Sequence, residues 1–341
     1  MAPFHEQLTL QNFTAFTNQT FEFIPGINVL VGENGTGKTH VLKAPYAWQM
    51  TRHLGQAGSS GKYEDVFVET YGAASVGELQ RTANKVATAS GKYGDKEWSV
   101  GFQKLVATDN GVRPSTPRPV FIPAIEMMAH ARNMNGILRD YADFDRTCFD
   151  FVAMVTAQPS AERFNPAISQ LTMLKDLVPG EVEWNKEEGR FYLSDKGKRL
   201  PYSLVAEGIR KVTALYRLVE HNWLLPGGVL FWDEPEVNIN PRWMDEIIEA
   251  LVILARSGVQ IFLATHSYVI LKQLDLTLRA QQNGTKESVQ ARFFSIRKER
   301  GASKAMWAHN FADLDPNPIL DQYDQMLAED WRLTDHAEER R

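Results

Sequence analysis

A glycine-rich stretch, Gly32–Thr39, carries the residue types that proteins use to bind phosphate groups. It fills every position of the pattern GxxxxGK[ST]. Its glycines allow the backbone N–H groups to point at phosphate oxygens, and the helix that follows adds its positive end. Lys38 is expected to reach the β- and γ-phosphates, and the Thr39 hydroxyl to ligate Mg²⁺. The alternative is a glycine-rich turn that matches the pattern by chance. Because every position is filled, we predict a nucleoside triphosphate site.

The predicted nucleotide contacts in this stretch are consecutive in the sequence. They are Gly32, Glu33, Asn34, Gly35, Thr36, Gly37, Lys38, Thr39 and the next residue, His40.

Further reactive side chains lie later in the chain, at the ends of two apolar segments. Val229–Trp232 is an apolar run that ends in Asp233 and Glu234. Asp233 is expected to hold Mg²⁺, and Glu234 to polarise the attacking water as general base. His266 follows a second apolar run and could sense the γ-phosphate or align the water, although a lone histidine is more often a satisfied surface or core residue. Lys38, Glu234 and His266 are therefore the predicted catalytic residues.

The elements that must position these groups alternate between strand and helix. Ile27–Val31, Val229–Trp232 and Val259–Ala264 are apolar runs typical of strands buried in a parallel sheet. Asn240 and Pro241 are a plausible N-cap and first residue of the helix between the last two strands. This order predicts an α/β fold with a central, mostly parallel sheet whose carboxyl edge carries the site.

Residues 55–200 separate the two halves of this pattern and are predicted to be an inserted lid lobe with helical and β-rich parts. The whole chain, residues 1–341, is then a single head with this lobe inside it. The segments of the lobe are predicted from local pattern alone. The β-like pieces are 66–68, 85–87, 98–100 and 120–122; the segment 124–178 is mostly helical, and 182–200 is a meander.

Composition limits the class of protein. The net charge is −5 and 43% of the residues are hydrophobic, which is typical of a soluble globular protein and not of a polycation. A single cysteine, Cys148, excludes a disulfide within the chain and suits a reducing compartment. The sequence contains no apolar run of about 18 residues. We therefore expect a cytoplasmic protein that does not span a membrane.

Together these motifs resemble the ABC-type ATPase heads of the RecF/SMC group, and most of all the small bacterial AAA-family ATPases related to OLD proteins. The resemblance covers roughly residues 4–50 and 200–325. The matching segments are the opening hairpin (Leu10–Phe16 and Phe21–Phe23), the Walker B motif (Asp233–Glu236), the D-loop (Asn238–Pro241) and the switch histidine in Thr265–Ser267. The resemblance implies a P-loop NTPase fold with an N-terminal β-hairpin, ATP and Mg²⁺ as cofactors, and Asn12 and Phe13 as further nucleotide contacts.

Two positions depart from the pattern of this group. Ala206 stands where the signature segment usually has serine, while Gly208 and the helix after it fit. The resemblance implies that Gly208 contacts the γ-phosphate of ATP held by an opposite subunit. Glu126 falls near the Q-loop, where glutamine is usual, and is either a further Mg²⁺ ligand or a surface carboxylate.

The mechanism that this resemblance implies is ATP-gated dimerisation of two heads, followed by hydrolysis and separation. The expected role is a switch in DNA repair or anti-phage defence, with an effector protein encoded nearby and DNA as candidate partners. One alternative is a nuclease component of OLD type without its own TOPRIM domain, since only 75 residues (341 − 266) follow His266. Another is the nucleotide-binding subunit of a transporter.

Two basic segments are candidates for contact with nucleic acid, although solvated surface charge is the commoner reading of such segments. Phe293 and Trp307 could stack bases beside the second of them. The basic residues are Lys196, Lys198 and Arg199 in one segment and Arg292, Arg297, Lys298 and Arg300 in the other.

Overall fold

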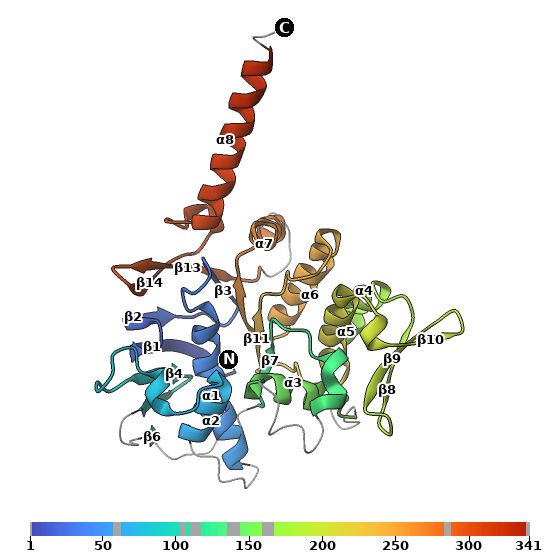
Figure 1. The fold of residues 1–341 in the computed structure, drawn as a ribbon, viewed down its shortest axis with the longest axis horizontal. Coiled ribbons are helices and arrows are strands. Elements are labelled where there is room, and N and C mark those ends of the chain that lie inside the picture. The colour runs from blue at the N-terminus through green and yellow to red at the C-terminus, as the bar shows by residue number, and fades with distance from the viewer. Residues whose placement is uncertain are drawn as a thin grey trace.

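The computed structural model describes residues 2–56, 63–102, 107–109, 117–134, 144–158, 167–282 and 288–338. Within these residues the strands form three sheets, and the central one has six strands in the order β14-β13-β3-β12-β11-β7. Neighbouring strands are parallel except for β13 and β14. The predicted central, mostly parallel sheet is confirmed (Figure 1). Its strands are β3 (Ile27–Gly32), β7 (Val120–Ile122), β11 (Val229–Asp233), β12 (Gln260–Thr265), β13 (Ala291–Glu299) and β14 (Ala302–Ala308).

An antiparallel sheet stands next to the central sheet and contains the predicted N-terminal hairpin. Its strands pair in the order β2-β1-β4-β5-β6. The third sheet is the predicted meander, in the order β10-β9-β8. The strands of these two sheets are β1 (His5–Phe13), β2 (Phe16–Glu22), β4 (Thr88–Tyr93), β5 (Lys96–Gly101), β6 (Ala107–Asp109), β8 (Glu181–Asn185), β9 (Arg190–Asp195) and β10 (Lys198–Pro201).

Helices cover both faces of the central sheet. The helices of the described chain are α1 (Lys38–Gln56), α2 (Tyr63–Tyr71), α3 (Arg146–Thr156), α4 (Thr172–Asp176), α5 (Glu207–Glu220), α6 (Met244–Arg256), α7 (Tyr268–Gln282) and α8 (Pro318–Glu338). In the part of the chain that the structure describes, no helix is both long and apolar enough to cross a membrane.

Alternate side chains of the buried strand β11 pack into two different hydrophobic clusters, one on each face of the sheet. Val229 and Phe231 join a cluster with α1 and the antiparallel sheet. Leu230 and Trp232 join the other cluster, which contains α3, α5, α6 and α7. Because both faces are covered, all five residues of β11 are buried, and Asp233 arrives at the carboxyl edge at the end of a rigid apolar strand.

Residues 55–200, predicted as one inserted lobe, contribute to all three sheets. Strands β4 and β5 extend the N-terminal hairpin, and β7 pairs with β11 in the central sheet. The β8–β10 sheet lies beside α4 and α5 at the far side of the molecule (Figure 1). The sequence between these parts includes residues 103–106, 110–116, 135–143 and 159–166, so the predictions for those residues lie outside the described chain.

Two of the short β predictions in this region are wrong. Residues 66–68 lie in α2, where Val66, Phe67 and Thr70 face the core, and residues 85–87 precede β4 without joining it. A run of three apolar residues fits a buried helix face as well as a strand, so periodicity alone does not separate them. The predicted strand at 98–100 is confirmed as part of β5.

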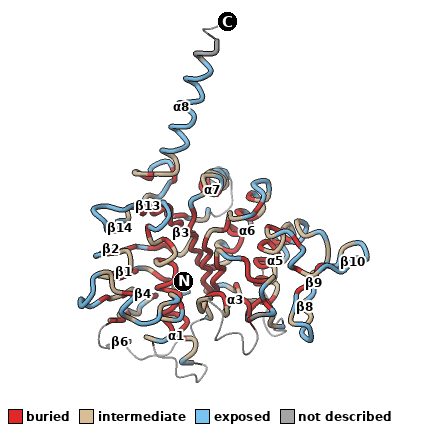
Figure 2. The backbone as a smooth tube through the Cα atoms, viewed as in Figure 1, coloured by how far each residue is buried: buried red, intermediate tan, exposed pale blue. Residues whose placement is uncertain are grey.

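The last helix, α8, projects away from the rest of the molecule (Figure 1). Its first turn begins at Asn317, whose Oδ1 accepts from the backbone N–H of Leu320 at 3.2 Å, with Pro318 as the first helical residue. Residues 321–334 are exposed on every side of the helix (Figure 2). Nothing in the sequence analysis anticipated a free-standing helix here.

Candidate nucleotide-binding site

The glycine-rich stretch forms the turn between β3 and α1 that the sequence predicts. Gly35 and Gly37 have φ values of +73° and +94°, a region that side chains with a Cβ rarely adopt. A Cβ at Gly37 would stand 2.9 Å from the ring of Phe16 in β2. Glycine is therefore required at this position both by its backbone and by the hairpin packed against it.

Lys38 lies inside the turn with its ammonium group turned towards the loop. Its Nζ donates to the carbonyl of Gly32 at 2.7 Å and to that of Glu33 at 3.0 Å. Burial lowers its pKa, although the carboxylates of Glu234 and Asp233 oppose this shift. A desolvated cation held by two carbonyls at the inner surface of the loop is well placed to bind a phosphate group.

Thr39 and Asp233 join the two predicted motifs directly. The Thr39 hydroxyl donates to Asp233 Oδ2 at 2.8 Å, across 194 positions of sequence. The other carboxylate oxygen, Asp233 Oδ1, is buried and has no hydrogen-bond partner among the described residues. Burial raises the pKa of Asp233 to about 6, because a charge here lacks solvent. A hydroxyl, a carboxylate and an unpaired buried oxygen suit a hard cation, so these residues fit Mg²⁺.

Glu234 follows with a strained backbone, at φ +47°. Its N–H donates to the carbonyl of Ala264 at 2.9 Å, which fixes the residue against the tip of β12. The side chain keeps about 30% of its surface exposed, and its Oε1 lies 3.6 Å from Nδ1 of His266. A left-handed non-glycine residue at a strand tip is a conformation that proteins retain mainly at functional sites. Two of the three predicted catalytic side chains, those of Glu234 and His266, therefore meet at one edge of the sheet.

Glu236, which the sequence analysis did not assign to the site, is the residue that positions His266. One oxygen, Oε1, accepts from the Thr265 hydroxyl at 2.7 Å and from the His266 backbone N–H at 3.1 Å. The other, Oε2, is buried without a hydrogen-bond partner among the described residues. Its position two residues beyond Glu234 was a signal in the sequence, but its contact with the next strand is visible only in the fold.

Lys211 on α5 is a second residue that the sequence analysis missed. Its Nζ is buried and has no hydrogen-bond partner in the described part of the chain. Burial lowers its pKa, and four carboxylates within electrostatic range oppose this shift: those of Glu207, Glu236, Glu126 and Glu234. An unpaired buried ammonium group lowers the stability of the folded protein. Its presence beside these carboxylates therefore indicates a functional role.

The signature segment forms the N-terminus of α5. Ala206 is the N-cap and provides no side-chain hydrogen bond, as expected for a residue without a hydroxyl. Gly208 is buried, and a Cβ there would stand 2.8 Å from the carbonyl of Asn238 in the D-loop of the same chain. Within this subunit, Gly208 thus allows α5 to approach the D-loop closely. Its predicted contact with a second subunit's phosphate stays a prediction.

Glu126 is buried and fully engaged by protein groups. Its Oε2 accepts from Arg210 Nε at 2.6 Å, and its carboxylate also accepts from the N–H groups of Met128 and Ala129. These bonds tie the segment after β7 to α5. The surface alternative for Glu126 is wrong, because its side chain is only 4% exposed. Its role as a Mg²⁺ ligand stays a prediction.

The hairpin residues Asn12 and Phe13 have structural partners of their own. The Asn12 amide donates to the carbonyls of Thr82 and Lys85 and accepts from the Thr82 N–H. Phe13 is fully buried and packs against other aromatic rings of the second core cluster. Their predicted nucleotide contacts are untested, and the contacts seen here hold the hairpin to the loop before β4.

His40, the last residue of the predicted phosphate-binding stretch, faces inward. Burial lowers its pKa to about 4, so the ring is neutral near pH 7. Its carbonyl accepts from the Tyr71 hydroxyl at 2.6 Å, which joins α1 to α2.

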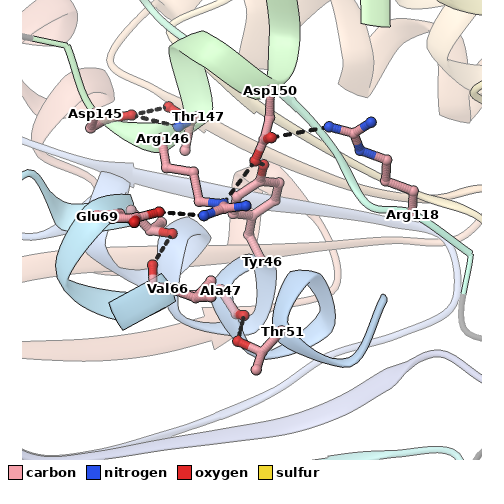
Figure 3. Close-up of polar contacts among 11 residues, drawn as sticks. Tyr46, Ala47, Thr51, Val66, Glu69, Arg118, Asp145, Arg146, Thr147 and Asp150 are labelled. Atoms are coloured by element: carbon pink, nitrogen blue, oxygen red, sulfur yellow. Dashed lines mark hydrogen bonds and ion pairs between the residues drawn. The ribbon is translucent and has the colours of Figure 1, made fainter. Parts of the chain in front are cut away.

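A network of charged groups fixes α1 to α3 below the phosphate-binding turn (Figure 3). Asp150 accepts from the Tyr46 hydroxyl at 2.7 Å, from Arg118 at 3.0 Å and from Arg146 at 3.2 Å. Arg146 also pairs with Glu69 of α2. This network joins α1, the helix that carries Lys38 and Thr39, to α2 and α3.

Comparison with known protein families agrees with this site. The family model described as "AAA domain, putative AbiEii toxin, Type IV TA system" matches residues 99–272, which is just over half of the 341 residues. The chain belongs to this AAA-domain family. A second model, described as "AAA domain", matches residues 7–45, which include the hairpin and the phosphate-binding turn.

Curated relatives of this AAA-domain protein match it over short segments. The DNA double-strand break repair Rad50 ATPase of Sulfurisphaera tokodaii is 30% identical over 112 residues, covering 32% of this chain and 13% of that protein. The chromosome partition protein Smc of Mycolicibacterium paratuberculosis is 39% identical over 79 residues, covering 23% and 6%. The DNA replication and repair protein RecF of Streptococcus suis is 43% identical over 47 residues, covering 14% and 13%. The chain therefore spans only a small part of these relatives.

Solved structures of SMC heads share the fold of this AAA-domain protein. The Smc head domain of Pyrococcus furiosus, bound to the C-terminal domain of ScpA, superposes with a TM-score of 0.55 at 11% identity, covering 96% of this chain and 99% of that one. A second SMC head, bound to the C-winged helix domain of ScpA, gives a TM-score of 0.51 at 12% identity, covering 91% and 99%. The resemblance to the heads of the RecF/SMC group is confirmed, and the chain has the fold of these heads.

Proposed function

We propose that the chain is an ATP-hydrolysing head that closes as a homodimer on ATP and acts as a switch in a DNA-associated process. The observation that carries the proposal is the direct bond between Thr39 and Asp233, with Glu234 and His266 at the same sheet edge. Segments that are far apart in the sequence thereby supply a phosphate site, a cation site and a base within one cluster.

Each side chain has a role in this proposal. Lys38 binds the phosphate groups, and the N–H groups of Gly35 and Gly37 line the turn around them. A Mg²⁺ held by Thr39 and Asp233 would neutralise phosphate charge and fix the geometry of the phosphate groups. Glu234 takes the proton of the attacking water, and His266, 3.6 Å from that carboxylate, aligns the water.

Dimerisation rests on the surface next to the signature helix. Leu204, just before α5, is 72% exposed, and Ile125, next to Glu126, is 56% exposed. The bond between Glu126 and Arg210 ties the Ile125 segment to α5, so both apolar side chains belong to one rigid surface. Large exposed apolar side chains around a helix N-terminus whose N-cap residue, Ala206, provides no side-chain hydrogen bond support a contact with a second nucleotide-bound subunit.

The wider role is drawn from the relatives. Three of them are named for DNA repair, chromosome partition and DNA replication and repair, which supports DNA as a partner. A second candidate is a defence function with a partner effector, because the matching family model is described as a toxin of a type IV TA system.

The test uses Glu234→Gln, which keeps the shape of the side chain but removes the base. Turnover should fall by about 10²- to 10⁴-fold, while nucleotide affinity stays close to wild type. Because separation follows hydrolysis, light scattering should find this variant as an ATP-dependent dimer. A monomer with ATP bound would overturn the dimer, and wild-type turnover in Glu234→Gln would overturn the assignment of the base.

A further inference from the structure

The projecting helix α8 carries large apolar side chains that nothing in the described chain covers. Between residues 321 and 334 every residue is exposed, and Met326 and Trp331 are 58% and 68% exposed (Figure 2). The exposed large apolar residues of this helix are Tyr323, Met326, Leu327, Trp331 and Leu333. A gathering of this size within eleven positions marks an interaction surface and not the scattered apolar exposure of ordinary surfaces.

These side chains form one stripe along the helix. The spacings from Tyr323 to Met326 and Leu327, and from Leu327 to Trp331, are three and four residues, so they share a face. At the base of the stripe Tyr323 stacks on Tyr268 of α7, with ring centroids 4.5 Å apart. Beyond this stack the helix leaves the body of the protein (Figure 1). A helix with an exposed apolar stripe is stabilised mainly by packing against a partner.

The charges around the stripe are acidic. Asp321, Asp324, Glu329 and Asp330 are exposed on α8, and Arg332 is the only basic residue from 318 to 334. Arg332 is already paired with Glu329, at 2.6 Å. Two α8 helices packed on each other would bring these carboxylates together, so charge disfavours that pairing and favours a basic, partly apolar surface.

The same chain presents such a surface on the β13–β14 hairpin. Met306 and Trp307, at the end of the edge strand β14, are 53% and 44% exposed. The hairpin carries one acidic residue, Glu299, against a larger basic set: Arg292, Arg297, Lys298, Arg300 and Lys304. The backbone edge of β14 is already bonded to the N-terminal hairpin: Ser303 N–H donates to the carbonyl of Ala15 at 2.9 Å, and Ala305 N–H donates to Gln19 Oε1 at 3.0 Å. A partner would therefore contact the side chains of β14 and not its backbone.

We propose that α8 of one copy docks on the Met306–Trp307 end of the β13–β14 hairpin of a second copy. The stripe on α8 meets Met306, which lies on the same side of β14 as Lys304, and the carboxylates of α8 face Lys304 and Arg300 of the hairpin. The helix reaches another copy because it projects away from its own hairpin (Figure 1). This contact differs from the proposed ATP dimer, which uses the surface at Leu204, and it needs no nucleotide.

The test is a charge exchange followed by light scattering at low ionic strength and without nucleotide. One variant, Asp324→Lys with Asp330→Lys, reverses the helix; the other, Arg300→Glu with Lys304→Glu, reverses the hairpin. All four side chains are exposed, so the fold is retained, which circular dichroism checks. Wild type should self-associate, and each variant alone should shift to the monomer mass of 38.6 kDa.

An equimolar mixture of the two variants should recover the association, because the reversed helix then meets the reversed hairpin. Three results would overturn the proposal. The first is a wild-type protein that is monomeric at all concentrations, which would leave α8 to a different partner. The second is a mixture that stays monomeric. The third is stronger self-association of the helix variant alone, which would indicate pairing of α8 with α8.

Discussion

Glu236 offers the sharpest test of how the site is held together. It accepts from the Thr265 hydroxyl at 2.7 Å and from the His266 N–H at 3.1 Å, so it fixes the segment that carries the histidine. Glu236→Ala removes both bonds and leaves the proton of the buried Thr265 hydroxyl without this acceptor, while the hydroxyl oxygen still accepts from the Ser267 N–H at 2.9 Å. Hydrogen bonds to a charged acceptor contribute about 1.5–3 kcal/mol each, so for two bonds we expect a loss of about 3–6 kcal/mol in the free energy of unfolding.

Turnover should fall as well, because His266 loses its anchor beside Glu234. A displacement of about 1 Å near the reacting groups can cost about 10²-fold in rate, and we expect a loss of that order. Nucleotide affinity should change little, since Lys38 and Thr39 are untouched. Denaturant unfolding, steady-state turnover and equilibrium nucleotide binding measure the three quantities.

Glu236→Gln is the matched control, because the amide oxygen can still accept both bonds. It should lie much closer to wild type than either Glu236→Ala or Glu234→Gln. If Glu236→Ala turns over like wild type, Glu236 does not position His266 and the reasoning fails. If Glu236→Gln is as inactive as Glu234→Gln, the two carboxylates have been assigned the wrong roles.

Two further predictions concern buried ionisable groups. Lys211→Met replaces an unpaired buried ammonium group with a side chain of similar shape, so stability in denaturant should rise by about 1–3 kcal/mol, and a loss would show that Lys211 is well paired. Burial lowers the pKa of His5 and of His221 to about 4, from 6.5 in the unfolded chain. Their stabilising contribution is complete above pH 6.5 and is lost as the pH falls towards 4, by about 2 kcal/mol for each between pH 7 and pH 5. His5→Gln should flatten this dependence in denaturant titrations at the two pH values, and an unchanged slope would contradict it.

The parts of the site that the sequence predicted are those carried by short, contiguous patterns. The phosphate-binding turn needs positive φ at Gly35 and Gly37 and a lysine at the helix start, and all of these lie within Gly32–Thr39. Asp233 and Glu234 end an apolar strand, so the parallel sheet brings them to the same edge as the turn. These residues could be predicted from local residue types and from the rule that the carboxyl ends of parallel strands meet at one edge of the sheet.

The residues that sequence reasoning missed depend on contacts between distant segments. Glu236 acts on Thr265 and His266 across the gap between two strands, and Lys211 lies near carboxylates from two other segments, those of Glu126 and of Glu234 and Glu236. The sequence also suggested Phe293 for base stacking, but this ring is 1% exposed because β13 is covered on that face. Such burial is decided by the neighbours of a strand, which its own sequence does not specify.

The helix α8 is a second case in which the sequence of a segment does not specify whether its side chains are buried. Its apolar spacing is readable in the sequence, yet the same spacing fits a helix packed on its own core. Only the fold shows that the stripe points into solvent between residues 321 and 334.

The central claim is that Gly32–Thr39 binds the phosphates of ATP, and equilibrium binding of a fluorescent ATP analogue tests it most directly. Wild type should bind the analogue, and Lys38→Ala should lose that binding, because the phosphate charge loses the buried cation of the turn. Lys92→Ala, which changes an exposed lysine in β4, should bind like wild type. Equal affinity in wild type and Lys38→Ala would contradict the account.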